Sequence, residues 1–249
     1  MENNNLNDQK NIVYNKTNTN IDYSNSDKRK FTTPVKELFL TLVFTIIFTL
    51  LLSLVPILGM FIHNNTVSYK PIIYLYPTAE TKVQVELGSP QNLTCSYPKY
   101  DSSWNVIAKP NGDLIDLSSG RSLYSLYWEG KNNYTQNITE GLCVKGEDSA
   151  KFLEEKLSIL GLSDREAEEF IIYWLPQLES NIYNIISFET MDEINKDMPL
   201  NITPTPDSLI RVMMKFKGVD SYFELPEQIL ETPQRTGFVA VEWGGTEIK

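Results

Sequence analysis

The hydrophobic positions of this chain form one long uninterrupted run, followed by short segments in which hydrophobic and polar residues alternate. The run, residues 38–62, holds 25 residues without a charged side chain (LFLTLVFTIIFTLLLSLVPILGMFI). A helix rises about 1.5 Å per residue, so the run would extend roughly 37 Å and cross a ~30 Å hydrocarbon core with some tilt. The pattern therefore predicts one transmembrane helix over 38–62.

Four basic residues flank this run on its N-terminal side: Lys28, Arg29, Lys30 and Lys36. The first basic residue on the other side is Lys70. Because basic flanks are retained preferentially in the cytoplasm, we expect a single-pass cell-membrane protein with a cytoplasmic N-terminus. The expected parts are a disordered cytoplasmic tail with a basic flank, the span, a linker and an extracytoplasmic domain, over residues 1–37, 38–62, 63–69 and 70–249.

A cleaved signal peptide is the alternative interpretation of the apolar run. Its apolar core usually covers only about 7–15 residues and ends in small residues before the cleavage site. The run here is longer, and Met60-Phe61-Ile62-His63 contains no such small-residue pattern. We therefore favour an uncleaved signal anchor.

Hydroxyl side chains recur at every fourth position within the predicted span: Thr41, Thr45, Thr49 and Ser53. Small hydroxyl residues at this spacing let two helices approach closely, which would support self-association. Alternatively, each hydroxyl bonds the carbonyl group four residues earlier in its own helix. The sequence leaves both interpretations open.

The segments after residue 70 alternate in the way that is typical of half-buried strands. Turn signals rich in Pro, Gly, Asn and Asp separate the first of them at intervals of about 8–12 residues. The predicted strands are residues 70–77, 82–87, 93–97, 104–109, 114–117 and 123–128, then 183–188, 208–216 and 237–243.

Helical periodicity interrupts this series of strands. One helix is predicted to end at Gly161, and Ser163 and Glu166 fit a capping box that begins the next. Both helices carry hydrophobic residues on one side, so the pair should form an αα-hairpin that covers a sheet. The predicted fold class is α+β: an antiparallel β-sheet or sandwich-like domain with an inserted αα-hairpin, preceded by one transmembrane helix.

Charge limits the expected partners. Residues 1–63 hold 6 of the 22 basic and 5 of the 32 acidic side chains, which leaves 16 basic and 27 acidic ones in the remainder. An acidic outer domain argues against nucleic-acid partners. Beyond the lipid bilayer itself, we expect an envelope polymer or another envelope protein as partner.

Two cysteines, Cys95 and Cys143, both lie in the predicted outer domain. An oxidising exterior would allow them to form a disulfide. Two separate thiols in a hydrophobic environment are the alternative. The sequence does not decide between them.

Few groups suit catalysis. The one histidine, His63, lies at the predicted membrane edge, which removes histidine-dependent triads and histidine zinc sites from the outer domain. No Gly-rich phosphate loop is present, so no nucleotide is expected. We expect no cofactor, no metal site and no assignable catalytic residue.

Carboxylates beside aromatic residues or glycines are the remaining catalytic candidates: Glu129, Glu140, Glu147, Asp148 and Glu242. Two carboxylates about 5–10 Å apart would suit glycoside hydrolysis. Helix capping and exposed strand ends explain the same acids without catalysis. Trp128, Glu129 and Trp243 are the candidate binding residues, because aromatic side chains next to acids and glycines make good anchors where they are partly open.

Several segments resemble, in order, those of a family of uncharacterised, mostly bacterial extracytoplasmic or membrane-anchored domains with related fungal copies. They read KPIIYLYP, LTCSYP, WNVIAKPNGDL, SLYWEG, VKGED, FIIYWLPQLE, TPTPDSLIRV and TPQRTGFVAVEWGG. The resemblance covers Lys70 to Gly245. It implies one folded unit and carries no mechanism.

The leading functional hypothesis is a single-pass membrane-anchored protein that displays a binding or interaction domain without catalytic activity. The first alternative is a carboxylate-dependent hydrolase of envelope glycan. The second is a structural accessory subunit of a membrane complex, which would assemble through the hydroxyl stripe of the span.

Overall fold

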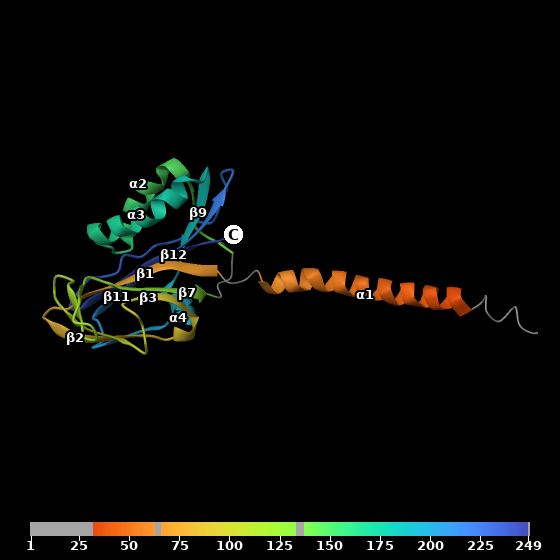
Figure 1. Ribbon diagram of the computed structural model, residues 1–249. Helices are drawn as coiled ribbons and strands as arrows, with labels where there is room; N and C mark the ends of the chain where they lie inside the picture. The colour runs from red at the N-terminus through yellow and green to blue at the C-terminus, as the bar shows by residue number, and fades with distance from the viewer. Residues whose placement is uncertain (1–31, 63–65, 133–136, 249) are drawn as a thin grey trace, which may run out of the picture. The chain divides into compact units, whose positions relative to one another are not determined.

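The computed structural model describes residues 32–62, 66–132 and 137–248 (Figure 1). The chain divides into two compact units, residues 1–61 and 62–249. Helix α1 covers Thr32–Ile62 and belongs to the first unit except for its last residue; its side chains are described from residue 35 to residue 50. Most of the expected cytoplasmic tail and part of the expected linker lie outside the described residues.

Helix α1 contains the hydroxyl stripe. The Oγ1 atoms of Thr41, Thr45 and Thr49 each lie 2.9 Å from the carbonyl oxygen four residues earlier, as the second interpretation of the stripe expects. Ser53 lies outside the described side chains. Among the helices and side chains that the structure does describe, none forms a segment long and apolar enough to cross a membrane.

The second unit has three layers. A mixed central sheet carries the helix pair α2 (Ser149–Ile159) and α3 (Asp164–Glu179) on one face and a smaller antiparallel sheet on the other (Figure 1). Alternation along the strands produces both interfaces. On strand β1 (Thr66–Tyr76), Ile72 and Tyr74 face the helices, whereas Ile73 and Leu75 face the smaller sheet. This confirms the predicted α+β class and the helix hairpin.

Within the described residues the central sheet has seven strands in the order β3-β7-β1-β12-β11-β9-β8. Their bounds are Leu93–Tyr97, Leu126–Asn132, Thr66–Tyr76, Val239–Glu247, Ser208–Val219, Tyr183–Phe188 and Leu142–Lys145. The strand order therefore places β3 and β8 at opposite edges.

The smaller sheet, as far as the chain is described, has five strands in the order β10-β2-β4-β5-β6. Their bounds are Leu200–Thr203, Thr81–Leu87, Trp104–Ala108, Leu114–Asp116 and Ser122–Leu123. Short 3₁₀ turns cover Pro90–Asn92 and Gly146–Asp148, and helix α4 covers Met191–Asp197.

The expectation of a wholly antiparallel sheet is wrong for one strand pair. Strands β11 and β12 run parallel, with Ser208 opposite Val239 and Phe216 opposite Glu247. Parallel neighbours need a crossover of a dozen or more residues, and residues 220–238, here called the strap, supply it. The strap contains no strand or helix, and no pattern in its sequence indicates that it joins two parallel strands.

The helix pair is formed as predicted. Helix α2 covers Ser149–Ile159 and is followed by Gly161 with φ +84°; α3 covers Asp164–Glu179. The backbone N–H of Ser163 donates to Glu166 Oε2 at 2.7 Å, and Ser163 Oγ accepts from the N–H of Glu166. The capping box also places the fully buried Glu166 carboxylate beside Arg235 of the strap, 2.9 Å away.

Candidate binding site

The two tryptophans expected to be partly open are both buried. Trp128 on β7 is 4% exposed and Trp243 on β12 is 0% exposed. The Nε1 atom of Trp128 donates to Glu242 Oε1 at 2.8 Å, and the Trp243 ring meets the Phe170 ring edge-on at 5.3 Å between centroids. The expected exposure is wrong because both faces of the central sheet are covered, so strand aromatics fill the core.

Glu242 belongs to a buried polar network between the sheets. Its Oε2 atom lies 2.6 Å from Arg211 Nε, and both side chains are fully buried. Arg211 also donates to Asn195 Oδ1 at 2.7 Å and to the carbonyl oxygen of Met198 at 2.9 Å. Both carboxylate oxygens therefore have donors, and the group serves as a structural ion pair that holds α4 against β11.

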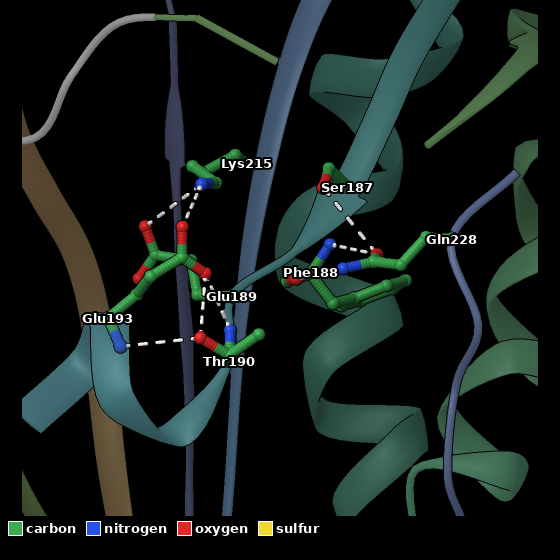
Figure 2. Close-up of polar contacts among 7 residues, drawn as sticks. All are labelled: Ser187, Phe188, Glu189, Thr190, Glu193, Lys215 and Gln228. Carbon is green, nitrogen blue, oxygen red and sulfur yellow. Dashed lines mark hydrogen bonds and ion pairs between the residues drawn. The ribbon is translucent and has the colours of Figure 1, made fainter. Parts of the chain in front are cut away.

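A second polar cluster lies at the other end of α4. Figure 2 shows Lys215 pointing toward the carboxylates of Glu189 and Glu193, at 3.7 Å and 3.5 Å. Thr190 caps α4 through a reciprocal pair of hydrogen bonds with Glu193. Because Lys215 is almost completely buried, its interactions with these carboxylates hold the start of the helix in place.

The carboxylates do not form a catalytic pair. Glu129 and Tyr127 are alternate residues of β7 and face the helix layer, whereas Glu242 contacts Trp128 on the opposite face of the same sheet. Glu147 lies near the far edge, where it pairs with Lys145 at 3.4 Å. Two acids on opposite faces of a sheet cannot flank one glycosidic bond.

A concave site does exist around Glu129. It is a groove of about 540 Å³, here called the tyrosine groove. Four tyrosines line it, together with Glu129, Ile72, Leu123 and two serines; these tyrosines are Tyr97, Tyr124, Tyr127 and Tyr173. The groove lies on the side of the central sheet that ends in β7 and the edge strand β3. Helix α3 contributes Tyr173 to it.

The local sequence explains how the tyrosine groove is built. Strand β7 alternates, so Leu126 and Trp128 enter the core while Tyr127 and Glu129 turn to the other face. The preceding turn adds Tyr124, which is 48% exposed, and edge strand β3 adds Tyr97, which is 51% exposed. Three separate elements thus bring aromatic rings to one concave surface.

Hydrogen bonds fix the polar atoms of this region. The Tyr127 hydroxyl donates to the Glu129 carboxylate, and the Tyr74 hydroxyl donates to Glu169 Oε2 of α3 at 2.6 Å. Burial, followed by the neighbouring Glu129 carboxylate, raises the pKa of Tyr127 above its ordinary value. Burial and Glu169 act in the same way on the pKa of Tyr74. Both hydroxyls therefore stay protonated donors into more alkaline solution than the hydroxyl of an exposed tyrosine does.

Arg165 of α3 is the cation beside the tyrosine groove. Its guanidinium carbon lies 5.4 Å from the centroid of the Tyr124 ring, and its Nε lies 3.5 Å from Glu169 Oε1. The Glu169 carboxylate offsets the charge of Arg165. Glu129 is the charged residue among those that line the groove, so a negative charge faces a bound ligand.

The arrangement suits binding better than catalysis. The lining serines have no histidine or lysine among the other lining residues to activate them. Across the described residues, no group of three His, Cys, Asp or Glu side chains is placed to hold a metal ion. What the tyrosine groove offers is rigid aromatic surface, hydroxyl groups and one carboxylate.

The two cysteines lie far apart and are both free. Cys95 is on β3 and Cys143 is on β8, the opposite edges of the central sheet. Six strand spacings of about 4.8 Å separate these edges, roughly 29 Å, whereas a disulfide needs Cα atoms within about 7 Å. A bond within one folded chain is therefore excluded by the topology.

Of the three binding candidates chosen from the sequence, only Glu129 lines the tyrosine groove, and none of its four tyrosines is among those candidates. The alternation in Leu126-Tyr-Trp-Glu129 contained the signal for Tyr127, because it puts that residue on the same face as Glu129. Tyr173 gave no comparable signal, since its contact with the groove depends on how α3 lies across the sheet. Comparison of the chain with known protein families, curated proteins and solved structures returned no match.

Proposed function

We propose that this protein is a membrane-anchored binding protein whose extracytoplasmic domain holds a neutral or cationic ligand in the tyrosine groove. The observation that carries the proposal is the groove itself, a 540 Å³ concavity with four tyrosines and one carboxylate. Binding sites for small ligands usually measure about 300–1,000 Å³ and combine an apolar lining with a few fixed polar groups.

The rigidity of the lining favours binding. Tyr127 and Tyr173 are held by the sheet and by helix α3, so little conformational freedom is lost when a ligand contacts them. Their rings offer apolar area, and the Tyr127–Glu129 hydrogen bond keeps the carboxylate in one position. Anionic ligands are disfavoured, because Glu129 and the acidic surface of the domain would repel them.

Membrane anchoring rests on the sequence. The uncharged run at 38–62 and the four basic residues before it predict a signal anchor that leaves residues 70–249 outside the cell. On this proposal the tyrosine groove faces the envelope, where a polymer or another envelope protein can present the ligand. The hydrolase alternative has no comparable support, because its candidate acids are not paired.

The groove is tested with the full chain in detergent and ligand-observed saturation-transfer NMR. The probes are choline, cellobiose, N-acetylglucosamine and a lysine tripeptide. We expect at least one saturable signal that disappears in the Tyr97→Ala/Tyr124→Ala double variant. Tyr222→Ala is the matched control, since that ring is 62% exposed on the strap and does not line the groove. The proposal fails if no probe signal depends on the two rings.

The topology is tested with the free cysteines. In intact cells that express a Cys143→Ser variant, a membrane-impermeant maleimide should label the exposed Cys95. A second variant lacks both native cysteines and carries Asn11→Cys, and it should react only after lysis. Labelling of Cys95 only in lysed cells would contradict the proposed orientation.

A further inference from the structure

We propose that the tyrosine groove recognises a trimethylammonium group, an inference that rests on the proposed binding function and names its ligand class. The charge of the lining gives the first argument. Glu129 supplies a negative charge inside the groove, and no lysine, arginine or histidine is among the lining residues. Arg165 beside the groove is already paired with Glu169 at 3.5 Å. The local field therefore favours a cation.

The aromatic rings give the second argument. A tyrosine ring carries a partial negative charge on its face and attracts cations within about 6 Å of its centroid. Tyr124 already interacts in this way with the Arg165 guanidinium at 5.4 Å. Tyr97 and Tyr124 are each about half-exposed, and Tyr127 and Tyr173 add rings from the sheet and the helix. Rings from several directions can surround a compact cation.

The supply of hydrogen-bond acceptors selects the kind of cation. A primary ammonium group brings three N–H donors that each need an acceptor when water is removed. The Glu129 carboxylate already accepts a hydrogen bond from Tyr127, and the other side-chain acceptors of the lining are the uncharged hydroxyls of two serines and the tyrosines, so no second charged acceptor faces a primary ammonium group. A trimethylammonium group has no N–H donor and presents methyl groups to the rings. It therefore matches this lining better than a bare lysine does.

The test compares choline with 3,3-dimethylbutan-1-ol, a neutral molecule of the same shape, on the full chain in detergent. Ligand-observed NMR titration gives both dissociation constants. We expect choline to bind at least about tenfold more tightly, and Glu129→Gln to remove most of that preference. Glu140→Gln is the control, because Glu140 is exposed and is not a lining residue. Unchanged thermal unfolding of Glu129→Gln excludes a general loss of structure.

Each outcome decides the inference. Preference for choline that depends on Glu129 and on Tyr97 supports it, and titrations with phosphocholine and Nε-trimethyllysine then separate a head group from a modified side chain as the source. Equal binding of choline and its neutral analogue overturns the cation inference and leaves the groove as a binding site. Binding of neither overturns it as well, and the wider proposal then falls only if the other probes also give no ring-dependent signal.

Discussion

The buried pair of Arg211 and Glu242 provides the sharpest test of what holds the two sheets and α4 together. The perturbation is Glu242→Gln, which keeps the shape of the side chain and removes its charge. Both native side chains are 0% exposed, and their closest atoms lie 2.6 Å apart. The variant leaves the Arg211 guanidinium buried without a counter-charge, although Asn195 and Met198 still accept hydrogen bonds from it.

Breaking a buried ion pair by removing one partner typically costs about 3–5 kcal/mol. The side-chain amide that Glu242→Gln introduces can still accept one hydrogen bond, so we expect the free energy of unfolding to fall by about 3 kcal/mol, at the lower end of that range. A domain of this kind is stable by only about 5–15 kcal/mol, so the change should be large and measurable. The double variant Arg211→Met/Glu242→Leu removes both charges and should be less destabilised than the sum of its own single variants, Arg211→Met and Glu242→Leu, by at least about 2 kcal/mol.

The assay is urea denaturation of the full chain in detergent, followed by tryptophan fluorescence. All four tryptophans are buried in the second unit, residues 62–249, so their emission reports its unfolding. The matched control is Glu247→Gln, an exposed acid at the end of the same strand, which should change stability by less than about 0.5 kcal/mol. Equal effects of Glu242→Gln and Glu247→Gln, or simple additivity in the double variant, would refute the reasoning.

Three further predictions test other features. Gly237→Ala should destabilise the domain by more than about 2 kcal/mol, because residue 237 has φ +61° and the added Cβ would lie 2.0 Å from Asp207 Oδ2. Gly120→Ala is the control: residue 120 has φ +70° but open space around it, so the change should cost only about 1 kcal/mol. Denaturant midpoints measure both effects. Burial and neighbouring carboxylates raise the pKa of Tyr74 and Tyr127, so the native state keeps protons that the unfolded state loses above about pH 10. Stability should therefore fall as the pH rises beyond that point, and less steeply in Tyr74→Phe; a fall of equal slope would contradict this account. Finally, the intact mass of the folded monomer should not change on reduction, since Cys95 and Cys143 lie on opposite edges of the sheet; a difference of two hydrogens would contradict the topology.

Local signals predicted the helix pair well. Gly161 and the Ser163–Glu166 box fix the ends of α2 and α3 through backbone conformation and local hydrogen bonds, which depend on a few adjacent residues. The β11–β12 pairing was not predictable in this way. Alternation within a strand indicates which residues share a face, but it does not indicate whether the neighbouring strand runs parallel or antiparallel.

The candidate site shows the same limit. Alternation in β7 indicates that Tyr127 and Glu129 lie on the same face of the sheet. It does not indicate whether that face is covered, because this depends on which other elements pack against the sheet. Trp128 and Trp243 are buried because a second sheet and a helix pair cover both sides of the central sheet. The sequence predicts a helix hairpin over a sheet but leaves a single sheet and a sandwich-like arrangement both open, so the exposure of the two tryptophans could not be judged from neighbouring acids and glycines.

One side chain of the strap, that of Gln228, covers backbone groups at the end of a strand. Gln228 Oε1 accepts from the backbone N–H of Phe188 at 2.8 Å, and Gln228 Nε2 donates to the carbonyl oxygen of the same residue (Figure 2). Strand β9 lies inside the sheet, but its pairing with β8 stops at Ile186, so at Phe188 a side-chain amide occupies the position that a further strand residue would take. Unprotected strand borders recruit foreign strands and start aggregation. Gln228 shields this border, so its replacement by alanine should lower the stability, because the N–H and C=O of the buried Phe188 lose these partners, and should also favour insoluble assemblies.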